Sequence, residues 1–181
     1  METATRSYLV TGGVRSGKST HAERLLRDHP AVTYVAPGPV PDPAADPDWA
    51  ARIAHHRARR PAGWRTVETG DVAGAVAAAD GAVLVDCLGT WLTAQIDAAD
   101  AWDAAADEVH ALVLGHLDAL TPALAAAAGP TVLVTNEVGL GVVPEHRSGR
   151  LFRDLLGIVN QRVAAGCDEV HLVVAGRVLV L

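Results

Sequence analysis

Residues Ser7 to Ser19 read Ser-Tyr-Leu-Val-Thr-Gly-Gly-Val-Arg-Ser-Gly-Lys-Ser, an apolar strand that runs directly into a glycine-rich loop. The spacing Gly-xxxx-Gly-Lys-Ser over its last eight residues is the motif of a phosphate-binding loop. Gly12 opens the turn, Gly17 leaves room for a phosphate, and the backbone N–H groups between them point inward. We expect Lys18 to reach the β- and γ-phosphates of a nucleoside triphosphate and the Ser19 hydroxyl to hold Mg²⁺.

Lys18 in this loop is the only lysine in the chain, and all the other residues counted as Lys or Arg are arginines. The alternative interpretation is a glycine-rich turn with a surface lysine. The preceding apolar strand and the helical pattern that follows are the context that the motif requires. A compact ammonium that occurs only here favours a phosphate site over a surface turn.

The length of 181 residues suits a single domain, residues 1–181, with a sizeable core. The formal charge of −6 argues against sequence-independent binding of nucleic acid, which needs a basic surface. Cys87 and Cys167 are too far apart in the sequence to indicate a disulfide framework or a zinc site, which indicates a reducing compartment. With no apolar run of signal-peptide or membrane-spanning length, we expect a cytoplasmic protein that does not insert into membranes.

Strand patterns alternate with helical patterns along the chain, which predicts an α/β domain with a mostly parallel sheet. Asp48 is the expected cap of the second helix, and a proline-rich loop precedes it. The last two strands are expected to form a hairpin at the sheet edge, joined by a Gly-Arg turn. The predicted strands are 7–11, 32–36, 64–68, 82–86, 131–135, 169–174 and 178–181. The predicted helices are 18–28, 49–60, 71–79, 91–128 (with breaks at 97–101 and at 121–122) and 148–165.

Asp86 ends an apolar strand, at the edge of the sheet where ligands bind in such folds. A carboxylate there can hold Mg²⁺ through water, together with Ser19. The alternative is an aspartate that only begins a turn. The phosphate-loop motif earlier in the chain favours the metal interpretation.

The predicted helix 49–60 carries a run of arginines around His55 and His56. Such a run is often only a solvated basic face, and no carboxylate or thiol lies at metal-ligand spacing. Flanking arginines, however, disfavour the charged form of an imidazole and keep it nucleophilic. They also neutralise a phosphoryl group under attack. The cluster therefore suits covalent catalysis by histidine on a nucleotide α-phosphate.

Several motifs together resemble the bifunctional adenosylcobinamide kinase/adenosylcobinamide-phosphate guanylyltransferases of cobalamin biosynthesis. The resemblance spans nearly the whole chain. The most specific stretches are Arg-Ile-Ala-His-His at 52–56 and Thr-Asn-Glu-Val-Gly-Leu-Gly-Val-Val-Pro-Glu at 135–145. Further matching stretches are Tyr34-Val-Ala36, Trp64-Arg-Thr-Val-Glu68, Val85-Asp-Cys-Leu88, Arg150, Phe152-Arg-Asp154 and Val159-Asn-Gln-Arg162.

The resemblance implies a RecA-like sheet of the P-loop NTPase type, a homotrimer, and two reactions at one site that uses GTP, ATP and Mg²⁺. The terminal phosphate of ATP or GTP passes to adenosylcobinamide. GTP then guanylylates a histidine, and adenosylcobinamide phosphate displaces it to give adenosylcobinamide-GDP. The nucleophile is His56 by the register of Arg-Ile-x-x-His, with His55 as the alternative. The implied nucleotide contacts are Gly12, Gly13, Val14, Arg15, Ser16, Gly17, Lys18, Ser19, Ala36, Pro37, Gly38, Arg57, Ala58, Arg59, Arg60, Glu68 and Asp86.

The sequence departs from the family pattern in two ways. Pro37 replaces a small polar residue, and Gly89 and Ala94 interrupt a pattern of serine or threonine followed by asparagine. The stretch 136–145 follows a core strand, so we expect it near the corrinoid or the nucleotide, the alternative being a simple glycine-bearing connection. The four tryptophans are expected in the core or at an interface. Two other functions stay open at this point, a small-metabolite kinase without the transferase step and a GTP-binding switch that is not an enzyme.

Overall fold

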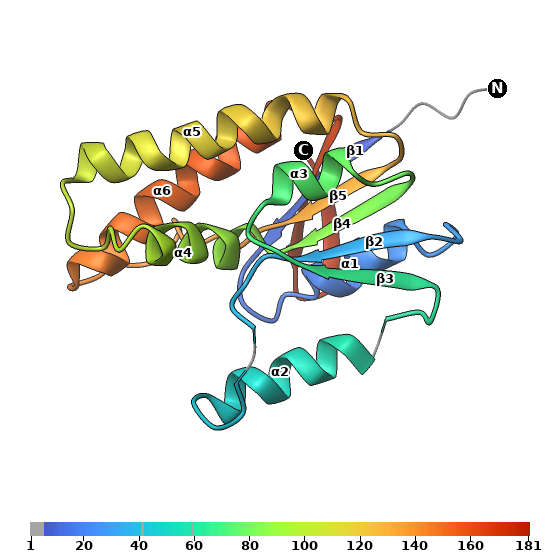
Figure 1. Cartoon of the computed structure of the whole chain (residues 1–181), viewed down its shortest axis with the longest axis horizontal. Helices are drawn as coiled ribbons and strands as arrows, with labels where there is room; N and C mark the ends of the chain where they lie inside the picture. The colour runs from blue at the N-terminus through green and yellow to red at the C-terminus, as the bar shows by residue number, and fades with distance from the viewer. Residues whose placement is uncertain (1–5, 41, 59) are drawn as a thin grey trace.

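The computed structural model describes residues 6–40, 42–58 and 60–181. Figure 1 shows a central twisted sheet with helices on both faces and one helix set apart from the sheet. The seven strands are β1 (Ser7–Gly12), β2 (Val32–Ala36), β3 (Trp64–Glu68), β4 (Ala82–Asp86), β5 (Thr131–Val134), β6 (Glu169–Val174) and β7 (Arg177–Val180). The helices are α1 (Lys18–Leu25), α2 (Pro47–Ala58), α3 (Val72–Ala77), α4 (Leu88–Ala98), α5 (Ala106–Ala125) and α6 (Arg147–Ala164).

The strand order is β3-β2-β4-β5-β1-β6-β7, and every neighbouring pair is parallel except β6 and β7. Strand β5 lies between β1, which precedes the glycine-rich loop, and β4, which ends in Asp86. Because parallel strands end at the same edge, the carboxyl ends of β1 to β5 bring their loops together. The predicted mostly parallel α/β sheet of the P-loop type, with its hairpin at the C-terminal edge, is confirmed.

The sheet is covered on both faces, which explains the continuous apolar runs of its strands. Side chains alternate along β1: Leu9 packs with helices α3 to α6, and Val10 packs on the other face with Ala22 and Leu26 of the α1 segment. The same alternation places Tyr34 of β2 on the α1 face. Helix α2, by contrast, has no buried residue and lies apart from the sheet (Figure 1).

Two predictions about helix boundaries were wrong. Helix α2 begins at Pro47, because Asp46 caps it: the Asp46 carboxylate accepts from the Trp49 N–H at 2.9 Å, and Asp48 lies in the first turn. Helix α5 continues through Pro122 instead of breaking there. Pro122 removes one backbone hydrogen bond of the helix, but the next turn still forms, because the Ala126 N–H donates to the Pro122 carbonyl.

Other differences are small shifts at the ends of elements. Helix α1 ends at Leu25 rather than at 28, and α4 begins at Leu88 rather than at 91. The hairpin turn consists of Ala175 and Gly176, both at positive φ, so that Arg177 already belongs to β7. No helix in the described part of the chain is long and apolar enough to span a membrane.

Candidate active site

The glycine-rich loop joins β1 to α1 with a backbone that only glycine tolerates at two positions. Gly12 has φ +154°, and a Cβ built there would lie 2.4 Å from the Val173 carbonyl oxygen. Gly17 precedes α1 with φ +98°. Both conformations are strained for other residues. The two glycines therefore allow a sharp turn after which the first N–H groups of α1 point toward a common centre. An anion-binding site requires this arrangement.

Lys18 is held within this loop. Its side chain is only 6% exposed, and its ammonium donates to the Gly13 carbonyl at 3.1 Å. Burial lowers the pKa of Lys18 below its ordinary value, and the negative charge of Asp86 opposes that shift. The Ser16 hydroxyl is also buried in the loop and has no hydrogen-bond partner among the described residues. An ammonium and an unpaired hydroxyl in a turn of N–H groups suit an oxyanion ligand.

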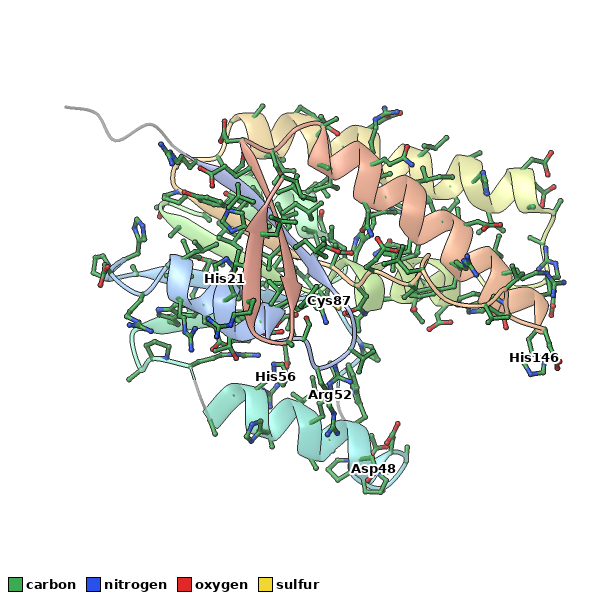
Figure 2. The ribbon with its side chains drawn as sticks, turned by 180° about the vertical axis from the view of Figure 1, so that it is seen from behind. His21, Asp48, Arg52, His56, Cys87 and His146 are labelled. Atoms are coloured by element: carbon green, nitrogen blue, oxygen red, sulfur yellow. The ribbon has the colours of Figure 1, made fainter. Side chains whose placement is uncertain are left out.

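A cleft of about 1080 Å³ separates the glycine-rich loop from α2. We call it the loop cleft. Figure 2 shows Arg52 and His56 projecting from α2 toward the body of the protein, where Cys87 lies. Anionic groups in this cleft would meet cations from both walls. Its lining residues are Arg15, Ser16, Gly17, Lys18, Ser19, Thr20, Asp46, Asp48, Trp49, Arg52, His55 and His56.

A second hollow, which we call the α2 pocket, lies between α2 and the ends of β2, β3 and β4. It shares Trp49, Arg52 and His56 with the loop cleft, so the two form neighbouring parts of one site. Its lining residues are Tyr34, Ala36, Gly38, Pro39, Trp49, Arg52, Ile53, His56, Arg57, Arg60, Glu68, Asp86, Cys87 and Thr90.

Asp86 is the carboxylate at the centre of the α2 pocket. Its Oδ2 atom accepts a hydrogen bond from the Tyr34 hydroxyl at 3.0 Å and lies 3.9 Å from Nδ1 of His56. Burial, reinforced by the Asp86 charge, raises the pKa of Tyr34 far above its ordinary value. The phenol therefore remains a donor to the carboxylate at physiological pH.

Arginines extend this cluster along the wall formed by α2 and the segment after it. Arg57 forms an ion pair with Glu68 at the end of β3. Arg60 donates to the Thr66 hydroxyl at 2.8 Å and lies over the ring of Tyr34, 3.5 Å from its centroid. The arrangement combines an imidazole, a carboxylate and fixed guanidinium groups beside an oxyanion loop, which is a suitable setting for phosphoryl and nucleotidyl transfer.

Comparison with known proteins agrees with this chemistry. Residues 8–181 match the family model described as cobinamide kinase / cobinamide phosphate guanyltransferase. The chain is 45% identical to the bifunctional adenosylcobalamin biosynthesis protein CobU of Salmonella typhimurium, over 93% of this chain and 95% of that protein. CobU of Escherichia coli is 43% identical over the same shares, and CobP of Pseudomonas aeruginosa is 40% identical over 93% and 92%.

The chain belongs to the cobinamide kinase / cobinamide phosphate guanyltransferase family. It is accordingly a transferase of cobalamin biosynthesis that has both activities. Among solved structures, a prototypical ATPase from the type III secretion system of pathogenic bacteria aligns with a TM-score of 0.56 at 11% identity. The alignment covers 92% of this chain and 50% of that one, and it shows the fold alone.

Most nucleotide contacts implied by the family lie together in the two hollows. Arg15 to Ser19 line the loop cleft, while Ala36, Gly38, Arg57, Arg60, Glu68 and Asp86 line the α2 pocket. Pro37 instead lines a separate hollow beside α4 and α5, and Ala58 is exposed at the end of α2. Val14 is 74% exposed on the loop. Arg59 lies outside the described residues.

Several lining residues were not among the predicted contacts, and Trp49, Arg52 and Tyr34 are the most informative of them. Trp49 was assigned to the core or an interface, yet it lines both hollows. Arg52 was recognised only as part of the basic cluster. Tyr34 was noted only as part of a family motif, although a lone phenol in an aliphatic strand signals a buried hydroxyl that needs a partner. Trp64 and Trp91, in contrast, are buried as predicted.

The residues present fit a magnesium ion that is bound largely by substrate. In the described ranges, no cluster of three or more His, Cys, Asp or Glu side chains is placed to hold a metal. Ser19 and Asp86 offer hydroxyl and carboxylate oxygens, the ligands that Mg²⁺ prefers. Mg²⁺ ordinarily uses one or two such groups and takes its remaining ligands from phosphates and water.

The stretch 136–145 begins at the glycine-rich loop, since the Glu137 N–H donates to the Gly12 carbonyl at 3.1 Å. Arg153 of α6 then braces it by donating to the carbonyls of Gly139 and Gly141. Leu140 is 90% exposed on this stretch. A role near the corrinoid or nucleotide stays a prediction.

Proposed function

We propose that both reactions of this enzyme use one nucleotide site and that His56 is the residue that carries the guanylyl group. The glycine-rich loop, the basic helix α2 and the carboxylate of Asp86 would all belong to one domain, residues 1–181. The observation that carries the proposal is the position of His56, which lines both hollows and has Nδ1 3.9 Å from Asp86. His55 lines only the loop cleft and stays the alternative nucleophile.

In the kinase reaction, the loop holds the β- and γ-phosphates of ATP or GTP through its N–H groups and Lys18. The hydroxyl of adenosylcobinamide attacks the γ-phosphorus, the bond to the bridging oxygen breaks, and the nucleoside diphosphate leaves. Ser19 and Asp86 would hold Mg²⁺ together with the nucleotide, and the ion would supply positive charge to the phosphates. The chain's own contribution is orientation and positive charge, which supply most of the catalysis in phosphoryl transfer.

In the transferase reaction, the loop orients the β- and γ-phosphates of GTP as the leaving group. A nitrogen of the His56 imidazole attacks the α-phosphorus, pyrophosphate leaves, and a P–N bond forms. A phosphate oxygen of adenosylcobinamide phosphate then attacks the same phosphorus, the P–N bond breaks, and the imidazole is restored. Asp86 lies on the Nδ1 side of the imidazole, 3.9 Å from that atom, so we assign the attack to Nε2 on the opposite side of the ring.

The remaining nucleotide contacts have separate roles in this scheme. Arg57 and Arg60 supply positive charge to the α-phosphate, and Glu68 holds Arg57 in place through their ion pair. Ala36 at the end of β2 and Gly38 after it line the α2 pocket and would form its wall around the nucleoside. The enzyme would work in the cytoplasm as a homotrimer, without nucleic acid.

Labelled GTP separates this function from that of a kinase alone. Protein incubated with Mg²⁺ and GTP labelled at the α-phosphate is expected to acquire acid-labile label, which adenosylcobinamide phosphate removes as adenosylcobinamide-GDP. A kinase without the transferase step would transfer γ-label to adenosylcobinamide and leave the protein unlabelled. A GTP-binding switch would bind nucleotide and transfer neither label.

A further inference from the structure

Tyr34 connects two parts of the site that lie on different elements. The residue is only 2% exposed within β2. Its hydroxyl donates to Oδ2 of Asp86 at the end of β4, at 3.0 Å. Its ring face carries the guanidinium of Arg60, whose carbon lies 3.5 Å from the ring centroid. One phenol thus contacts both a carboxylate and a cation of the α2 pocket.

The hydroxyl restricts the orientation of Asp86. A hydrogen bond to a carboxylate is among the stronger ones in proteins, and here it is protected from water because the phenol is buried. The bond engages Oδ2, the same atom that lies 3.9 Å from Nδ1 of His56. Partners of this kind around a ligating group commonly change metal affinity tenfold or more when they are removed.

The ring restricts Arg60 in a different way. A planar guanidinium stacks on an aromatic face, and such a pair is stronger where water is excluded. Arg60 also donates from Nη1 to the Thr66 hydroxyl at 2.8 Å and lines the α2 pocket. The stack and this hydrogen bond therefore fix the guanidinium at the wall of the pocket.

We propose that Tyr34 is a positioning residue with two separable roles: its hydroxyl aligns Asp86 for the metal-bound phosphates, and its ring holds Arg60 for the nucleotide itself. The inference rests on the proposed function, since it takes Asp86 and Arg60 as nucleotide contacts. Its own content is that the hydroxyl and the ring can be removed one at a time. The hydroxyl also interacts with the Arg60 guanidinium, but the stack on the ring remains when only the hydroxyl is removed.

Direct binding of a GTP analogue tests the proposal without any turnover. The analogue carries a methylene group in place of the α,β-bridging oxygen, so that His56 cannot be guanylylated. Calorimetry with and without Mg²⁺ gives two quantities, the metal-free affinity and the factor by which Mg²⁺ increases it. Thermal unfolding of each variant measures stability separately.

Tyr34→Phe removes only the hydroxyl, so the Mg²⁺ factor is expected to fall about tenfold while the metal-free affinity changes less than about twofold. Arg60→Lys removes the planar stack, so the metal-free affinity is expected to fall about fivefold. The Mg²⁺ factor is expected to remain that of the wild type. Tyr34→Leu is expected to lower both quantities. Tyr8→Phe is the matched control, because Tyr8 is the only other tyrosine and packs on His171 away from the site.

Two results for Tyr34→Phe would overturn the proposal. One is a Mg²⁺ factor equal to that of the wild type, and the other is a metal-free affinity that falls as much as the Mg²⁺ factor does. Either result would indicate that the hydroxyl has only a structural role. If Tyr34→Leu does not fold, Tyr34→Phe and Arg60→Lys still decide the question. Failure of the wild-type protein to bind the analogue would instead refute the proposed function, and this inference with it.

Discussion

Replacement of Gly12 by alanine tests the geometry of the glycine-rich loop. The added Cβ would lie 2.4 Å from the Val173 carbonyl oxygen and 2.7 Å from the Ser16 hydroxyl oxygen. A backbone carbonyl cannot rotate away as a side chain can, so strand β6 or the loop has to move. Overpacking of this kind costs about 1–3 kcal/mol, and the φ of +154° adds about 1–2 kcal/mol. We expect Gly12→Ala to lower the free energy of unfolding by about 3 kcal/mol.

Two other glycines of the same loop separate these causes. Gly17 has φ +98°, but a Cβ there would meet nothing nearer than 3.5 Å, so Gly17→Ala should cost only the backbone strain, about 1–2 kcal/mol. Gly13 is the matched control. It has no positive φ, and a Cβ there would meet nothing within 4 Å. Gly13→Ala should be neutral or stabilise by up to about 1 kcal/mol, because alanine restricts the unfolded chain.

Urea unfolding of the wild type and the three variants measures these differences. In a chain of this size each kcal/mol corresponds to about 2–4 °C in Tm, so Gly12→Ala should melt about 6–12 °C lower than the wild type. GTP binding should weaken in Gly12→Ala and Gly17→Ala, and less in Gly13→Ala. Equal losses of stability in Gly12→Ala and Gly13→Ala would refute the assigned cause.

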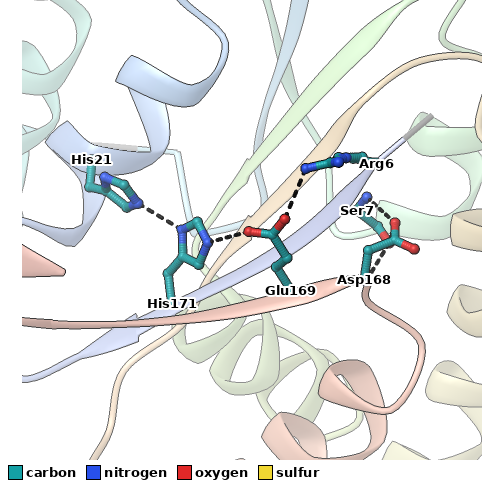
Figure 3. Close-up of polar contacts among 6 residues, drawn as sticks. All are labelled: Arg6, Ser7, His21, Asp168, Glu169 and His171. Carbon is teal, nitrogen blue, oxygen red and sulfur yellow. Dashed lines mark hydrogen bonds and ion pairs between the residues drawn. The ribbon is translucent and has the colours of Figure 1, made fainter. Parts of the chain in front are cut away.

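The only lysine and a pair of histidines, one buried and one half-buried, give two further tests. Amine-reactive reagents should modify only Lys18 and the N-terminus, and Mg²⁺ with GTP should protect Lys18; equal labelling with and without nucleotide would count against the phosphate loop. Figure 3 shows the second site, where His21 lies 2.8 Å from His171 and His171 lies 2.9 Å from Glu169. Burial lowers the pKa of His21, aided by the neighbouring His171 and Arg24, so the folded state binds the proton less readily than the unfolded chain. The His21 contribution to stability should therefore be complete above about pH 6.5 and decrease as the pH falls below it. The Tm of His21→Gln should fall less than that of the wild type between pH 7 and pH 5, whereas the exposed control His146→Gln should behave like the wild type. The same dependence of Tm on pH in the wild type and both variants would contradict this assignment.

The strands could be predicted from the sequence because a sheet covered on both faces leaves uninterrupted apolar runs. The bounds of β2, β3 and β4 match the prediction at both ends. The order of the strands does not follow from such runs, since pairing is decided by contacts between distant segments. The position of β5 between β1 and β4 was accordingly not predicted.

The part of the site that could be predicted is the loop whose backbone conformation requires particular residues within one short stretch of sequence. A phosphate loop needs glycine at fixed positions, so Gly12 and Gly17 are visible in one short stretch. Tyr34 and Arg60 are far apart in the sequence, and their stacking depends on how the segment after α2 returns to the sheet. Helix α2 was predicted, but its Asp46 cap was not, because Asp46 and Asp48 are equally good capping residues by type.

The central claim is that a triphosphate held by the glycine-rich loop is attacked by His56 of α2. Intact-protein mass spectrometry after exposure to Mg²⁺ and GTP tests it most directly. We predict one added guanylyl group in the wild type and in His55→Ala, and none in His56→Ala, with all three proteins folded and able to bind nucleotide. An unmodified wild type, or an adduct that persists in His56→Ala, would contradict the account.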